Sequence, residues 1–96
     1  MNWYKKAQAD IAYRGGFTDF GAHFVVFRIR DKFYSYKLSF PDWINKVQQM
    51  AKHSPGKALD WAKKNSTVVY EVKENYPLPG SIIREVGEEE AQNENS

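Results

Sequence analysis

Two neighbouring stretches of alternating side chains constrain the fold of this chain more than any other part of its sequence. Between Val25 and Ile29 the odd positions are apolar and the even positions change to arginine, which predicts a half-buried strand over residues 23–30. Asp31-Lys32 is the expected reversal, and residues 33–38 return as a second strand. The sequence therefore predicts an antiparallel hairpin.

The length of the reversal sets the pairing of these two strands. With a two-residue loop, the expected pairs are Ile29 with Tyr34, Phe27 with Tyr36 and Val25 with Leu38, which makes one face aliphatic and aromatic. A one-residue slip would exchange the faces of one strand. On the expected pairing, the opposite face is basic and carries Arg28, Arg30, Lys37 and the ring of Phe33.

Two helical segments are expected directly after the hairpin. Ser39 is suited to cap a first helix that begins near Pro41 and runs from Trp43 to about His53. Its apolar stripe is expected to contain Phe40, Ile44, Val47, and Met50 or Ala51.

Ser54 and Pro55 then restart the helix, which is expected to end near Asn65. The inner stripe of this second helix is Ala58, Leu59 and Ala62. Both helices are therefore predicted to lie on one face of the sheet.

The remaining segments complete an α+β prediction. We expect a single domain over residues 1–86, with a small antiparallel sheet of three to four strands, two consecutive helices packed on one face and a short N-terminal helix. Residues 11–13 are expected as a short edge strand that ends at Gly15-Gly16, followed by a connecting turn over 17–21. Further strands are expected over 67–73, with Val68, Tyr70 and Val72 toward the core, and over 81–86. Residues 87–96 are expected to form a disordered acidic tail.

Composition excludes several classes of protein. The absence of cysteine excludes a disulfide scaffold, a cysteine nucleophile and thiolate zinc sites. Two histidines are too few for a histidine-rich metal cage, so no metal or cofactor is expected. No apolar run reaches the roughly 20 residues of a membrane span, which predicts a cytoplasmic protein with no membrane partner. Six Phe, six Tyr and three Trp supply the large side chains that a core of this size needs.

The formal charge of +2 is unevenly distributed along the chain. All fourteen Lys and Arg lie within residues 1–84 against seven acids, whereas the last twelve residues hold five Glu and no base. A basic body with an acidic tail favours a surface that binds polyanions, with ordinary solvated faces as the equally weighted alternative.

The middle of the chain resembles the KTSC domain, a small domain found alone in bacterial and phage proteins and at the C-terminus of some lysyl-tRNA synthetases. The likeness covers about residues 23–65 and consists of Tyr34-Ser35-Tyr36 in a strand, a helix begun at Phe40-Pro41, and Ala51 to Gly56 as a helix corner. One extra residue separates Ala51 from Ser54, and Trp61 and Asn65 are displaced counterparts of the family's later positions. The resemblance implies a small α+β domain for which RNA binding is proposed, without catalysis.

Binding of RNA or single-stranded nucleic acid is the function that the sequence favours. The basic sheet face, with Arg28, Arg30, Lys37 and Phe33, places cations beside an aromatic ring, as in proteins that bind single strands. Ser54, Gly56 and Lys57, with His53, offer a phosphate contact at a helix N-terminus, although the same residues suit a plain helix corner. Tyr34 and Tyr36 are expected in the core rather than as stacking platforms.

A small protein-interaction or inhibitor module, of phage origin for example, is the alternative function. Trp43 and Trp61 lie beside the apolar stripes, so each is either a partner anchor or a rim side chain that covers the core. Homodimerisation through a sheet edge belongs to this alternative. An enzyme is not expected, because His53 next to Ser54 has no orienting carboxylate and no two carboxylates have a fixed spacing.

Overall fold

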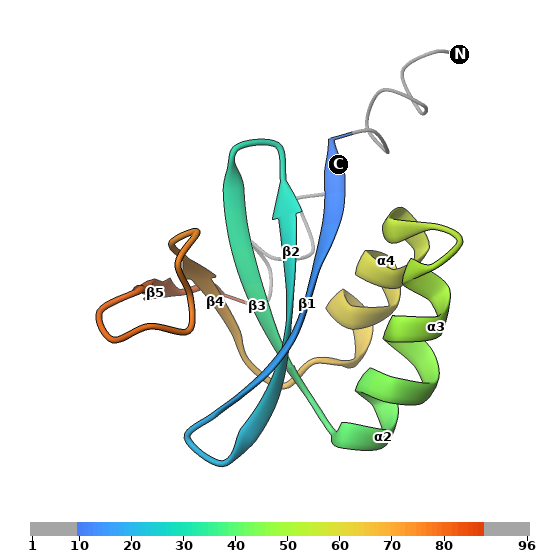
Figure 1. Cartoon of the computed structure of the whole chain (residues 1–96), viewed down its shortest axis with the longest axis horizontal. Helices are drawn as coiled ribbons and strands as arrows, with labels where there is room; N and C mark the ends of the chain where they lie inside the picture. Colours follow the sequence, from blue (N-terminus) through green and yellow to red (C-terminus); the bar gives the residue numbers. More distant parts are fainter. Residues whose placement is uncertain (1–9, 88–96) are drawn as a thin grey trace.

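Within residues 10–87, the part of the chain that the computed structural model describes, five antiparallel strands follow one another across a single sheet (Figure 1). The strands are β1 (Ile11–Asp19), β2 (Ala22–Ile29), β3 (Lys32–Leu38), β4 (Val69–Val72) and β5 (Ile82–Glu85). The α+β class is confirmed, but the sheet has five strands rather than three to four. The helix expected near the N-terminus and nearly all of the expected tail lie outside the described residues.

Strand β1 is longer than the sequence predicts, because its glycines bend the strand instead of ending it. Gly15 has φ +116°, and the register of β1 against β2 shifts between Tyr13 and Gly15, as in a β-bulge. Gly16 serves a different purpose: a Cβ there would lie 2.0 Å from Cε2 of Trp43. The first glycine therefore accommodates the bulge, and the second leaves room for an indole ring.

The turn between β2 and β3 lies one residue earlier than predicted. Its central residues are Arg30 and Asp31, and the observed pairs include Phe27 with Tyr34 and Val25 with Tyr36. Arg30 adopts φ 59°, and its N–H donates to the carbonyl of Asp10 at 2.8 Å, which fixes this turn. The predicted pairing was thus wrong by two residues, but the faces are those predicted because side chains alternate with a period of two.

The first helical segment covers residues 40–51 and changes its winding in the middle. It consists of α2 (Phe40–Asp42), a π-helical turn (Trp43–Val47) and α3 (Gln48–Ala51). The Ser39 hydroxyl accepts from the Asp42 N–H at 3.3 Å, so the predicted cap is confirmed. The predicted stripe is wrong at Phe40, which is exposed, because Trp43 takes the inward position and packs against the core.

The second helix, α4 (Pro55–Asn65), agrees with the prediction at both ends. Ser54 caps it by accepting from the Lys57 N–H at 3.2 Å, and Pro55 occupies its first turn. Ala58, Leu59 and Ala62 are buried as expected, which packs α4 against the sheet.

The main core lies between the helices and one face of the sheet, and Figure 1 shows the helices on one side of the sheet. Tyr34 and Tyr36 are both buried there, which confirms that they belong to the core. The cluster is made of Val25, Phe27, Tyr34, Tyr36, Leu38, Val47, Ala58, Leu59, Ala62, Val69 and Val86.

The opposite face of the sheet is also covered at its centre, so the prediction of an open face there is wrong. A second cluster of Val26, Val72 and Tyr76 packs with Phe17, Phe33 and Tyr70. Tyr76 comes from the loop over residues 73–81, which closes on itself through the Lys73 N–H and the Ser81 carbonyl at 2.7 Å. In β4, Val69 packs in the main core on the helix side, whereas Tyr70 and Val72 pack in the second cluster under this loop. Strand β4 is therefore buried on both sides, although the sequence predicted a single core face.

Candidate nucleic-acid interface

Arg28 is held by the backbone of its own hairpin. Its guanidinium donates to the Arg30 carbonyl at 2.7 Å and to the Asp10 carbonyl at 3.5 Å. These bonds connect β2 to the turn and to the residue before β1. Arg28 therefore stabilises the turn, while Arg30 lies exposed at the tip.

Phe33 and Lys37 do not meet on one open surface. The Phe33 ring is packed into the second cluster, and the guanidinium carbon of Arg14 lies 5.2 Å from its centroid. Arg14 also approaches a carboxylate oxygen of Glu74 at 3.9 Å. Lys37 is four positions further along β3, a distance of about 13 Å, and pairs with Phe24. The four residues predicted as a sheet-face group are therefore spread along the hairpin.

The corner between α3 and α4 brings three basic side chains to the surface. Lys52, His53 and Lys57 are exposed within six consecutive residues. The Ser54 hydroxyl accepts the Lys57 N–H, and Gly56 is buried. The cations are therefore the part of this corner that is open to a ligand.

Most of the net positive charge of residues 10–87 belongs to their helical part. Residues 39–66 hold five lysines against two aspartates, a net charge of +3. Residues 10–38 and 67–87, which form the sheet and its loops, hold seven bases against six acids, a net charge of +1. Sequence inspection missed this division because it compared only the body with the tail.

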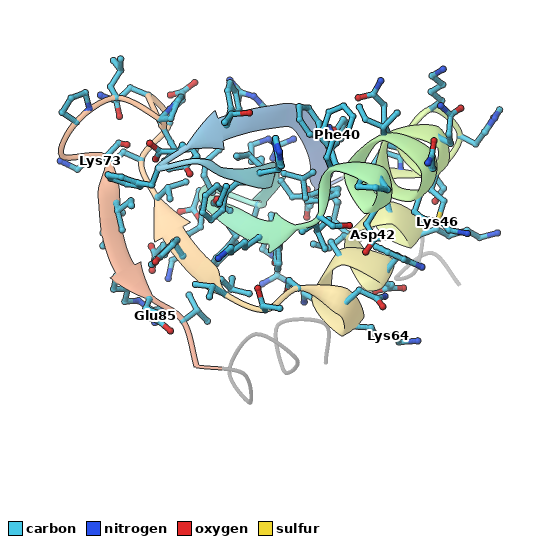
Figure 2. All side chains as sticks on the ribbon, turned by 90° about the horizontal axis from the view of Figure 1, so that it is seen from below. Phe40, Asp42, Lys46, Lys64, Lys73 and Glu85 are labelled. Carbon is cyan, nitrogen blue, oxygen red and sulfur yellow. The ribbon has the colours of Figure 1, made fainter. Side chains whose placement is uncertain are left out.

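Three of the seven basic side chains on the sheet side have partners, whereas Arg30, Lys32 and Lys73 are exposed there. On the sheet side, Arg84 donates to Glu71 at 2.8 Å, and Arg14 and Arg28 have the partners described above. We define the helix-layer lysines as the four exposed lysines of residues 39–66, namely Lys46, Lys52, Lys57 and Lys64. Within residues 10–87 their ammonium groups make no hydrogen bond or ion pair with the protein. Figure 2 shows Lys46 and Lys64 pointing outward from the helices, at the opposite end from Lys73 and Glu85.

The two tryptophans are partly buried rather than free. Trp43 donates its indole N–H to the Tyr13 hydroxyl at 3.1 Å and packs against the main core. Trp61 packs against the same cluster, and its carbonyl accepts from the Asn65 amide at 2.8 Å. Both therefore cover the core.

Sequence inspection missed two exposed rings. Phe20 is 89% exposed and Phe40 is 50% exposed. The signal for Phe20 was present in its position before Gly21, since a two-residue turn exposes both of its central side chains. The exposure of Phe40 was not predicted, because its spacing from Ile44 and Val47 is that of an apolar helical stripe.

Two tyrosines that pack on opposite faces of the sheet, Tyr13 and Tyr76, have raised pKa values. Burial raises the pKa of Tyr13, and the hydrogen bond from Trp43 partly offsets this rise. Burial is also the main cause of the raised pKa of Tyr76. Both phenols therefore resist ionisation in the folded protein.

Within the described residues, no group of three or more His, Cys, Asp or Glu side chains is placed to hold a metal ion. In the same part of the chain no helix has the length and apolar character to span a bilayer. Comparisons with protein-family models, with curated proteins and with solved structures find no match.

Proposed function

We propose that this chain is a non-catalytic module that binds RNA or single-stranded nucleic acid through the helix-layer lysines. The observation that supports this proposal is that four exposed lysines lie within residues 39–66, a segment of net charge +3, and that none of these four ammonium groups has a partner among residues 10–87. The resemblance of residues 23–65 to the KTSC domain stands as a proposal beside it and favours RNA. The proposal also retains a cytoplasmic location.

The spacing of the lysines suits contacts with separate phosphates. Lys57 and Lys64 are seven residues apart on α4, which is about 10 Å along the helix axis, and both are exposed. Lys46 extends from the neighbouring helix, and Lys52 adds a positive charge at the corner, next to the exposed His53. Asp60 lies between Lys57 and Lys64 on α4, so the lysines flank an acid instead of forming an unbroken row.

The sheet side contributes less to this proposal than the sequence suggested. Arg28 is engaged by carbonyls and Phe33 is packed in a cluster, so Arg30 is the exposed member of that group. Tyr34 and Tyr36 are buried and offer no stacking surface. Electrostatic attraction to phosphates, without reading of bases, is the mode of binding that these positions support.

The test is a pair of matched double variants titrated with a fluorescent single-stranded RNA. Lys46→Gln with Lys57→Gln removes two charges from the helices, and Lys32→Gln with Lys73→Gln removes two exposed charges from the sheet side. We expect the helix pair to weaken binding at least about tenfold and to lower the salt slope by about 1.4, since each lost phosphate contact on a single strand changes the slope by about 0.7. The sheet-side pair should change affinity by less than about twofold.

Equal losses from both pairs would mean that net charge alone governs binding. Retention of binding by the helix pair would remove the helices as the interface. A titration with duplex DNA of matched length decides between single-stranded and duplex ligands.

The alternative function is a protein-interaction module, and one observation favours keeping it. Trp43 and Trp61 are packed against the core, but Phe20 and Phe40 expose large apolar surfaces. Light scattering tests the homodimeric form of this alternative by measuring the mass of the protein in solution. A dimer that does not bind RNA would replace the first proposal.

A further inference from the structure

We propose that the acidic segment of this chain, residues 88–96, binds to the helix-layer lysines of the same molecule and competes there with nucleic acid. The competition rests on the proposed function, whereas the contact itself can be measured without nucleic acid. Three observations support it: the lysines have no partner among residues 10–87, the segment has the opposite charge, and its point of attachment packs against α4.

The structure fixes the place where this segment begins. Val86 is buried in the main core together with Leu59 and Ala62 of α4, and its N–H donates to the Val69 carbonyl at 2.8 Å. Gly87 follows it and is exposed. The acidic segment therefore leaves the body on the helix side of the sheet, from a residue that is held by both packing and a hydrogen bond.

The direction of β5 leads the chain toward the C-terminal end of α4. Strands β4 and β5 are antiparallel, so β5 ends where β4 begins, and residues 66–68 connect that end of β4 to α4. Lys64 lies in the last turn of α4, whereas Lys73 follows the far end of β4. In Figure 2, Glu85 and Lys64 lie at the two ends of the lower edge of the view, and Lys73 lies above Glu85. The chain therefore leaves β5 toward Lys64 and away from Lys73.

The segment is long enough to make the contact. Lys64 precedes Val69 by five residues, so their Cα atoms are at most about 18 Å apart. Glu94 is eight residues beyond Val86, and an extended chain of that length spans about 28 Å. Lys64 is therefore within reach of the segment, and Lys57 is about 10 Å further along the same helix.

The charges of the two partners are complementary. Residues 88–96 hold four Glu and no Lys or Arg, whereas residues 39–66 have a net charge of +3 and four exposed lysines. A tethered segment acts at an effective concentration in the millimolar range, so ion pairs that are individually weak still compete with a free ligand. The segment therefore lowers the affinity of these lysines for nucleic acid without closing the site.

The first experiment tests the contact in the full chain and without nucleic acid. A carbodiimide couples a carboxylate to an amine that it touches, and mass spectrometry of the digested protein identifies the two residues. We expect links from the glutamates of the segment to Lys64 or Lys57, and Lys64→Gln should remove the larger share of them. In a mixture of isotope-labelled and unlabelled protein, links within one molecule never join the two forms.

Three results of this experiment would overturn the proposal. They are links made mainly to Lys5, Lys6 or Lys73, links that join labelled to unlabelled chains, and the absence of any link to α4. The control variant Lys73→Gln should leave the links to α4 unchanged.

The second experiment tests the competition with two double variants that remove the same charge. Glu90→Gln with Glu94→Gln neutralises part of the segment, and Asp31→Asn with Glu74→Gln neutralises two exposed acids on the sheet side. In titrations with the fluorescent single-stranded RNA at low salt, we expect the segment pair to raise the affinity at least about threefold, because a tethered competitor is weakened. The sheet-side pair should raise it less than about 1.5-fold, through net charge alone.

Equal gains from the two pairs would overturn the competition, because net charge alone would then govern the affinity. Failure of the proposed function is recognised separately. If no variant binds RNA while the links to α4 form, the proposed function is wrong and the contact stands. If RNA binding depends on Lys46 and Lys57 while no link to α4 forms, the contact is wrong and the proposed function stands.

Discussion

The two faces of the sheet are covered by different means. On one face, helices capped by Ser39 and Ser54 supply Val47, Leu59 and several alanines to the main core. On the other face, a loop supplies Tyr76 over Val26 and Val72, with buried Ser35 beneath. Helices bury a face with many small contacts, whereas a loop does so with one large ring and leaves polar atoms beside it.

This difference teaches where the surface of the protein is available for binding. A sheet face whose centre is covered by its own loop has no room for a nucleic-acid strand, and this moves the candidate interface to the helices. Substitutions beneath the helices and beneath the loop test the two faces separately through the stability of the protein.

The largest effect is expected from Gly16→Ala, which tests how tightly the helix side is packed. The new Cβ would lie 2.0 Å from Cε2 of Trp43, so the indole must move and lose its bond to Tyr13. We expect a loss of about 3 kcal/mol in the free energy of unfolding, measured by urea denaturation. Gly87→Ala is the control, because a Cβ there meets nothing within 4 Å. Equal midpoints for the two variants would contradict the packing described for Trp43.

The direct comparison of the two faces uses neighbours on β2. Val25 is 0% exposed toward the helices, and Val26 is 4% exposed toward the loop. We expect Val25→Ala and Val26→Ala each to cost about 2 kcal/mol, from lost apolar burial and the cavity left behind. A cost below about 0.5 kcal/mol for Val26→Ala, typical of a surface position, would mean that the loop does not cover this face in solution.

The stability of the protein at alkaline pH tests one tyrosine on each face, Tyr13 on the helix side and Tyr76 on the loop side. Burial raises the pKa of each phenol above its ordinary value, so the folded state holds the proton more tightly than the unfolded state. Their contribution to stability is therefore complete below about pH 10 and decreases as the pH rises through the raised values in the folded state. Urea midpoints should fall above about pH 10. Tyr76→Phe and Tyr13→Phe should each reduce this fall. If the urea midpoint of a variant falls with pH as steeply as that of the wild type, the substituted tyrosine does not contribute to the pH dependence.

The smallest effect is expected from Ser35→Ala, beneath the loop. Ser35 is fully buried, and its hydroxyl faces the Tyr76 phenol at a separation longer than a normal hydrogen bond. Because this contact with Tyr76 is long, removing the hydroxyl should change the free energy of unfolding by no more than about 1 kcal/mol in either direction. A loss of more than about 1 kcal/mol, the usual value of a hydrogen bond, would reveal that Ser35 has a partner in solution.

The local patterns in the sequence predicted local structure well. The caps at Ser39 and Ser54, the helix that ends at Asn65 and the buried pair Tyr34 and Tyr36 are confirmed, because short-range signals determine them. The two-residue error in the hairpin register left the faces unchanged, since alternation constrains the face and not the exact partner.

Features that depend on distant residues were not predicted. Gly16 was expected to break β1, but it is needed for Trp43, which is 27 positions away in the chain. The cover over Val26 comes from Tyr76, in a stretch whose prolines predicted no strand and gave no indication of where it would pack. The site prediction was limited for the same reason, because the surface left open depends on which loop lies over which face.

The loop over residues 73–81 has a consequence for hydrogen exchange. Its backbone bonds close within the segment, at Lys73 with Ser81 and at Leu78 with Asn75, and it continues directly into β5 at the sheet edge. Such a segment can separate from the body as one cooperative unit while the helix side remains folded. Amide protons in β5 should therefore exchange with solvent faster than those in β2 and β3, and the same opening would uncover Val26 and Val72.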